Sequence, residues 1–143
     1  MPPHLGHVHL IVADLDRAIE FYTGLLDLSV TEQHGSYAFL SFGDRHHDLA
    51  LQARPDASSQ PPNSRGLYHV AFELDTLAAL GDAAGWLDDE GITVQPVDHG
   101  ISRSLYFDDP DGNGVELYVD TRTDDDEQWH GENTRFDPAT TTR

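Results

Sequence analysis

A repeat with a shift of 62 residues is the feature that most restricts the fold of this chain. His7–Leu15 (HVHLIVADL) and His69–Leu77 (HVAFELDTL) begin with the same His-Val pair and continue with a similar apolar pattern. In each copy alternating apolar residues predict a strand, and a helix-capping residue, Asp14 or Thr76, then precedes apolar residues at helical spacing. The 143 residues therefore predict two similar halves, each opening with a strand and a helix.

Three further strands are expected after each helix, separated by residues with turn chemistry. In the first half we expect strands at residues 28–33, 37–42 and 47–53, and in the second half at residues 92–97, 104–108 and 115–120. Gly91 suits the end of the second helix, and residues 109–114 (DPDGNG) suit a hairpin turn. The pattern predicts an α+β fold of two βαβββ modules.

Two segments lie outside these modules. Residues 55–66 are rich in proline and serine and are expected to be a linker between a first module at 1–54 and a second at 67–120. Residues 121–143 are expected to be a largely disordered acidic tail, in which Trp129 and Phe136 are the large apolar residues. An alternative is that this tail closes over a pocket as a lid.

The charge of the chain excludes several classes of partner. The formal net charge is -18, and all 8 basic side chains are arginine. Such a surface repels nucleic acids and anionic membranes, so neither is expected as a partner. The absence of lysine favours a protein adapted to high salt, although a simple solubility bias remains an alternative. No apolar run approaches the length of a membrane span and no signal segment opens the chain, so we expect a cytoplasmic protein.

Histidines and a carboxylate are the candidate metal ligands, because the chain has no cysteine. His7 and His9 share one face of the first strand, and the repeat pairs His7 with His69 but His9 with an alanine, which favours His7. Glu116 shares a strand face with Tyr118; a carboxylate facing inward is costly unless it is paired or binds a metal, but it can also face solvent. Two histidines and one carboxylate leave positions open on Fe(II).

The strongest local pattern surrounds the expected hairpin of the second half. It consists of Val97–His99, Leu105–Tyr106, Asp109–Gly112 and Glu116 at fixed spacings. With the repeat, this pattern resembles the vicinal oxygen chelate superfamily, and within it the type I extradiol ring-cleaving dioxygenases, over about residues 5 to 120. The resemblance implies that the two modules form a cupped mixed sheet around a metal site. It also implies that His7, His69 and Glu116 hold Fe(II), with Mn(II) as the alternative.

A second match concerns the residues that would handle protons and substrate. Asp44–His47 resembles the segment in which these dioxygenases carry a histidine pair, which implies that His47 is the acid/base near dioxygen and His46 its neighbour. His99 and Tyr106 would hydrogen-bond the oxygens of the substrate. Without the resemblance, a His-His pair at a turn is commonly solvated, and Tyr106 can be a plain core residue.

The function implied by this resemblance is cleavage of a catechol-type ring with O2 by a homodimer. A glyoxalase-type isomerase would need a further carboxylate on the last strand of the first module, where the chain has Leu49–Gln52. A fosfomycin-resistance-type transferase uses three ligands but does not call for His47, His99 and Tyr106. A metal-free drug-binding protein would not need to keep all three ligand positions.

Overall fold

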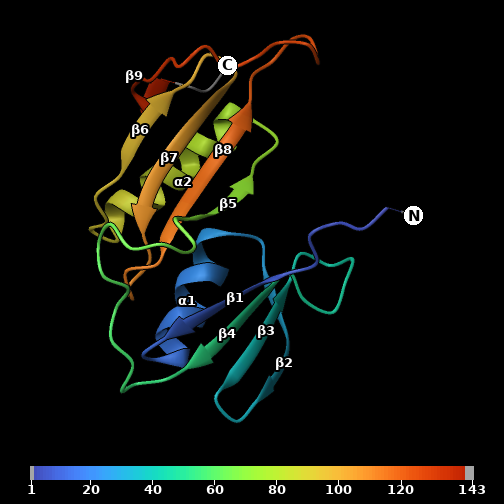
Figure 1. Ribbon diagram of the computed structural model, residues 1–143, viewed down its shortest axis with the longest axis vertical. Helices are drawn as coiled ribbons and strands as arrows, with labels where there is room; N and C mark the ends of the chain where they lie inside the picture. The colour runs from blue at the N-terminus through green and yellow to red at the C-terminus, as the bar shows by residue number, and fades with distance from the viewer. Residues whose placement is uncertain (1, 141–143) are drawn as a thin grey trace. The chain divides into compact units, whose positions relative to one another are not determined.

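The computed structural model describes residues 2–140 and has the α+β fold expected from the repeat (Figure 1). The first half contains β1 (Val8–Val12), α1 (Leu15–Leu25), β2 (Ser29–His34), β3 (Tyr37–Ser41) and β4 (Leu49–Ala53). The second half contains β5 (Val70–Glu73), α2 (Leu77–Asp89), β6 (Gln95–Asp98), β7 (Ser102–Asp108), β8 (Gly114–Asp120), β9 (Thr134–Arg135) and the 3-10 turn η1 (Pro138–Thr140). Both halves thus have the element order βαβββ.

The two sheets have equivalent strand orders. The first sheet has the order β1-β4-β3-β2, and the second has the order β5-β8-β7-β6 with β9 added at its edge. In each sheet the opening strand pairs parallel with the last strand of its module, and the remaining neighbours are antiparallel. The repeat in the sequence therefore corresponds to a repeat in topology.

Contacts between residues divide the chain into two units. The first unit runs to Ser64 and includes the turn Asp109–Asn113, and the second comprises Arg65–Asp108 and the chain from Gly114 onward. This division follows contacts rather than the repeat, so the expected module limits remain predictions.

The core of the first unit lies between α1 and one face of its sheet. The Asp14 side chain accepts a hydrogen bond from the backbone N–H of Arg17 and caps α1, as expected. The helix buries Ala18, Phe21 and Tyr22. The sheet contributes Leu10, Val12, Ala38, Leu40, Leu49 and Leu51, which alternate along their strands. His9, Tyr37, Phe39 and Gln52 point to the opposite face by the same alternation.

The second unit follows the same plan. Thr76 caps α2 by accepting from the N–H of Ala79, and Gly91, with φ +74°, ends the helix. The N–H of Ile92 donates to the carbonyl of Leu87 and the N–H of Gly91 to that of Asp88, which is the Schellman arrangement. Buried apolar residues of α2, β7 and β8 form the core: Leu80, Ala83, Leu87, Leu105, Phe107, Val115, Leu117 and Val119.

The turn between β7 and β8 belongs to the first unit through hydrogen bonds. Buried Asp109 accepts from the Tyr22 hydroxyl at 2.7 Å and from backbone N–H groups of its own turn. Asp111 accepts from the N–H of Ala13 and from the Arg17 guanidinium, both through Oδ1. The Asn113 amide donates to the carbonyl of Ile11. The acidic residues of this turn therefore have structural partners in α1 and at Ala13, just after β1.

Several expectations differ from the structure. The strand expected at residues 47–53 begins at Leu49, which leaves His47 in the preceding loop, and the strand expected at residues 104–108 begins at Ser102. Residues 92–94 precede β6 rather than belonging to it, because the N–H of Ile92 completes the cap of α2. The tail was expected to be largely disordered from residue 121, but Thr134 and Arg135 form β9, which pairs with Asp98 and Val97 of β6. This pairing satisfies the edge of the second sheet, a constraint that composition does not show.

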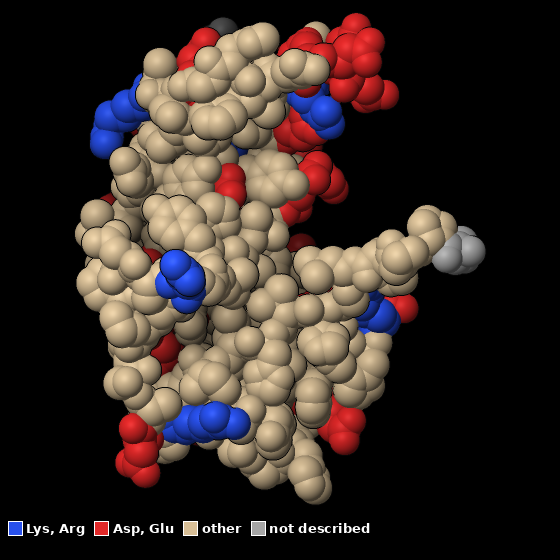
Figure 2. Space-filling model, in the orientation of Figure 1, with Lys and Arg blue, Asp and Glu red and all other residues tan. Residues whose placement is uncertain are grey.

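Acidic side chains occur at several separate places on the face drawn in Figure 2, with few arginines among them. Four arginines form ion pairs with an aspartate of their own unit: Arg17 with Asp111, Arg45 with Asp48, Arg103 with Asp98, and Arg122 with Asp120. Within residues 2–140 no helix has the length and apolar content needed to cross a membrane.

The Tyr22→Phe substitution should lower the free energy of unfolding by about 1–3 kcal/mol, because it removes a buried donor to the Asp109 carboxylate. Urea denaturation would measure the loss. Tyr118→Phe is the matched control, since the Tyr118 hydroxyl donates to Glu73 at an exposed position and its loss should cost much less. Equal losses in the two variants would contradict the role assigned to the buried bond.

Candidate metal-binding and catalytic site

The register of β5 and β8 brings His69 next to Glu116. These strands pair parallel, with Ala71 opposite Glu116, and His69 lies one residue before β5. The Nε2 atom of His69 is 3.0 Å from Oε1 of Glu116, and the Glu116 side chain is only 13% exposed. An imidazole nitrogen and a largely buried carboxylate are donors that suit a divalent transition metal. Both predicted ligands of the second half are therefore in contact.

Gly114 makes this close approach possible. A Cβ atom at this position would collide with the carbonyl oxygen of Tyr68 and would lie 3.3 Å from the Cβ of His69. The backbone before β5 consequently passes directly over the start of β8. Any larger residue at position 114 would push His69 away from Glu116.

Tyr106 and His99 complete the group in the second unit. Tyr106 lies opposite Glu116 in the β7–β8 pairing, and its ring centre is 5.6 Å from that of His69. Its hydroxyl is 2.8 Å from Nε2 of His99. Burial raises the pKa of the Tyr106 phenol above its ordinary value, against a smaller opposing effect of the Ser104 hydroxyl, and the Glu116 charge raises it further. Tyr106 is therefore a neutral phenol near pH 7.

A cavity of about 780 Å³ lies over this group, within the second unit. Among its lining residues are His69, His99, Tyr106 and Asn133. The remainder of the wall mixes polar and apolar side chains: Tyr68, Thr93, Gln95, Val97, Phe107, Asp108, Gly114 and Val115. This volume lies in the range of small-molecule sites.

His7 and His47 come together in the first unit. His7 directly precedes β1 and His47 lies in the loop before β4, and their ring centres are 4.4 Å apart. The ring of Phe39 packs at 4.9 Å from that of His47. Burial lowers the pKa of His47, and the imidazoles of His7 and His46 lower it further. His47 is therefore mainly neutral near pH 7.

A chain of hydrogen bonds determines which nitrogen of His47 carries the proton. The carboxylate of Glu32 can only accept, so the proton of His46 is on Nε2, 3.0 Å away. The Nδ1 atom of neutral His46 is then an acceptor for Nδ1–H of His47, at 2.9 Å. This leaves Nε2 of His47 with a free lone pair, as a general base requires.

The sequence-predicted residues thus fall into two groups. His69, Glu116, Tyr106 and His99 meet in the second unit, whereas His7 and His47 meet in the first. His9, the alternative to His7, is instead within 3.0 Å of the Gln52 amide. Within residues 2–140 no three His, Cys, Asp or Glu side chains are grouped closely enough to hold a metal ion. The roles assigned to the predicted residues therefore remain predictions.

Sequence reasoning missed several partners of these residues. Glu32 lies on exposed β2, and its contact with His46 depends on a β-bulge between Val30 and Glu32. Asn133 and the carbonyl of Glu132 contact His99 from the tail. No motif or periodicity marks these positions; they would be found only from the pairing of distant segments.

The chain is similar to known proteins over most of its length. The profile of the "Glyoxalase/Bleomycin resistance protein/Dioxygenase superfamily" matches residues 4–117. The chain is 35% identical to biphenyl-2,3-diol 1,2-dioxygenase 2 of Rhodococcus globerulus, over 87% of this chain and 67% of the relative. It is 36% identical to catechol-2,3-dioxygenase of Bacillus subtilis over 82% of this chain, and spans only 41% of that relative's length.

A solved structure shows the same fold. The fosfomycin resistance protein FosX from Mesorhizobium loti superposes with a TM-score of 0.65 and 26% identity. The match covers 86% of this chain and 97% of that protein.

The NMR titration of His47 should have its midpoint below the ordinary pH of 6.5 in metal-free protein, because the folded environment disfavours the charged imidazole. In His46→Ala the midpoint should rise but stay below 6.5, since burial is the larger cause. His34→Ala, on exposed β2, is the control and should leave it unchanged. A midpoint at or above 6.5 in the unaltered protein would contradict the assignment.

Proposed function

Because this chain belongs to the Glyoxalase/Bleomycin resistance protein/Dioxygenase superfamily, we propose that it is a metal-dependent dioxygenase that cleaves a catechol-type ring beside its two hydroxyl groups, using O2. The observation that carries this proposal is one cavity lined by His69, which contacts the Glu116 carboxylate, and by a neutral phenol, Tyr106, hydrogen-bonded to the His99 imidazole. The two dioxygenase relatives support the reaction class. A homodimer remains our expectation for the active form.

The residues assigned to the metal are His7, His69 and Glu116. Their donor atoms are nitrogen and oxygen, and the contact between His69 and Glu116 supports this assignment for two of the three side chains. This chemistry fits Fe(II), with Mn(II) as the alternative. When bound, the metal would supply a Lewis acid with open positions for substrate oxygens.

The other side chains would hold the substrate and move its protons. Tyr106 and His99 line the cavity, which supports the proposal that they hydrogen-bond the oxygens of a diol. His47 has a free Nε2 lone pair and a lowered pKa, so it can accept a hydroxyl proton and later return it. The described residues that line the cavity include no arginine, which favours a neutral aromatic diol over a carboxylated one.

A transferase of the fosfomycin-resistance type is the second candidate. The observation in its favour is the similarity of the chain to FosX, at 26% identity with a TM-score of 0.65. Such a reaction gives no role to the His99–Tyr106 pair. One assay separates the dioxygenase from the transferase. Protein loaded anaerobically with Fe(II) is mixed in high salt with neutral catechols, and the uptake of O2 and the absorbance of the yellow product are recorded. Metal-loaded protein that consumes fosfomycin but neither O2 nor catechol would overturn the proposal.

The His47→Ala substitution should lower ring-cleavage turnover by about 10²–10⁴, because it removes a general base. The iron content should stay near that of the unaltered protein, since His47 is not a proposed ligand. Turnover under saturating O2 and iron analysis of the same samples would measure both quantities. His34→Ala is the matched histidine control and should change neither. Parallel loss of iron and turnover in His47→Ala would refute the assignment.

The Glu116→Gln substitution should weaken Fe(II) binding at least about tenfold, because it replaces a proposed anionic ligand with a neutral amide of the same shape. Equilibrium dialysis under anaerobic conditions would measure binding. Glu73→Gln is the matched control, since Glu73 lies on the neighbouring strand and bonds to Tyr118 instead. Equal affinity of the two variants would exclude Glu116 as a ligand.

A further inference from the structure

The tail is attached to the second unit around His99. The β9 strand pairs with β6 immediately before His99 in the sequence. Beyond β9, Phe136 packs under the guanidinium of Arg103, 5.5 Å from the ring centre. Before β9, the Trp129 ring lies edge-on to His99 at 6.2 Å, and its indole N–H donates to the carbonyl of Glu132. Contacts on both sides of residues 130–133 therefore fix this segment beside His99.

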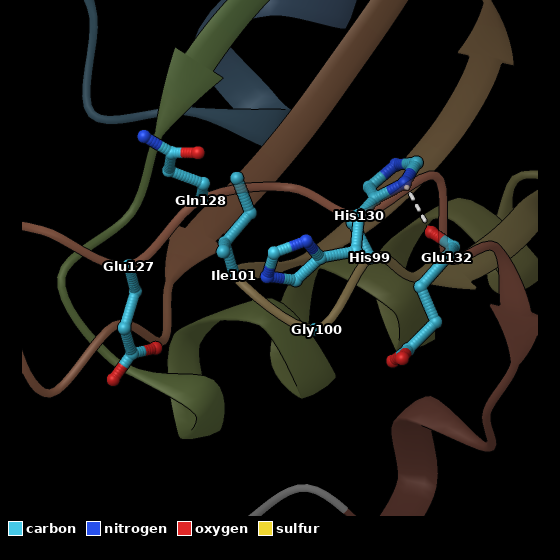
Figure 3. Close-up of a pocket in the computed structure, with 7 residues that line it drawn as sticks. All are labelled: His99, Gly100, Ile101, Glu127, Gln128, His130 and Glu132. Atoms are coloured by element: carbon cyan, nitrogen blue, oxygen red, sulfur yellow. Dashed lines mark hydrogen bonds between the residues drawn. The ribbon is translucent and has the colours of Figure 1, made fainter.

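A small cavity of about 180 Å³ shows how closely the tail follows the loop after β6 (Figure 3). His99, Gly100 and Ile101 form one side, and Glu127, Gln128, His130 and Glu132 of the tail form the other. The Glu132 carboxylate covers Gly100, where a Cβ atom would lie 3.0 Å from Oε2. Gly100 also has φ +83°, a conformation that other residues rarely adopt.

Two tail oxygens contact the ring nitrogen of His99 that faces away from Tyr106. Nδ1 of His99 is 2.6 Å from Oδ1 of Asn133 and 3.3 Å from the carbonyl oxygen of Glu132, marked by the dashed line in Figure 3. A carbonyl oxygen can only accept, so the proton must be on Nδ1. Neutral His99 then has a lone pair on Nε2, which accepts from the Tyr106 hydroxyl at 2.8 Å.

We infer that Asn133 is a positioning residue of this site: together with the Glu132 carbonyl, it holds His99 in the Nδ1–H tautomer, with Nε2 as an acceptor. Asn133 also lines the large cavity, so the tail is part of its wall. The effect on substrate binding rests on the proposed function, because it assumes that a diol hydroxyl donates to this acceptor or to its partner Tyr106. The tautomer itself is independent of any reaction.

The test uses two variants of Asn133 in the full chain. Asn133→Leu keeps the approximate size but removes the acceptor, whereas Asn133→Asp keeps an acceptor oxygen. Asp126→Asn, elsewhere in the same tail, is the control for a general effect of tail substitution. Long-range ¹H–¹⁵N NMR of metal-free protein reports which imidazole nitrogen of His99 carries the proton, with the signals assigned by loss in His99→Gln.

We expect the Nδ1–H tautomer in the unaltered protein, in Asn133→Asp and in Asp126→Asn, and a mixture of tautomers in Asn133→Leu. Catechol binding to the Fe(II)-loaded protein should be about three- to tenfold weaker in Asn133→Leu than in the unaltered protein and Asp126→Asn, as for one lost hydrogen bond. A mixed tautomer in the unaltered protein, or a pure Nδ1–H tautomer in Asn133→Leu, would overturn the inference. If no catechol binds any form, the proposed function fails, while the NMR result still decides the role of Asn133.

Discussion

The parallel register of β5 and β8 is the constraint on which the candidate site depends. Because Ala71 lies opposite Glu116, the residue before β5, His69, must lie beside Gly114, the first residue of β8. Gly114 lets the two backbones approach without a Cβ between them. Antiparallel pairing with β7 then adds Tyr106 on the same face. A shift of one residue in either pairing would turn the carboxylate or the phenol toward the α2 core.

The fold was largely predictable because its determinants are local or repeated. Asp14, Thr76 and Gly91 have the capping roles that their residue types suggest, and the shift between His7 and His69 reflects equivalent strands in two sheets of equal order. The pairing of β9 was not predictable, since two polar residues carry no periodic signal. Its partner β6 lies far away in the sequence, and only the assembled sheet edge selects it.

The candidate site was predictable as a set of residues but not as a network. Patterns identified His69, Glu116, His99 and Tyr106, which contact one another in the structure. They also identified His7 and His47, but not the contact between these two rings. Glu32, which contacts His46, and Asn133, which contacts His99, lie on exposed segments where their residue types are common. These two side chains nevertheless determine where protons lie on two imidazoles. Glu32 fixes the proton of His46 and, through His46, that of His47, whereas Asn133 acts directly on His99.

The turn Asp109–Asn113 has a consequence for how such a chain can be divided. It is encoded within the second βαβββ repeat, yet its carboxylates accept hydrogen bonds from Tyr22, Ala13 and Arg17 of the first. A fragment that stopped at Ser64 would lack the Asp109 acceptor for the buried Tyr22 hydroxyl. Two halves separated after Ser64 would therefore not be self-sufficient, although their sheets have equivalent strand orders.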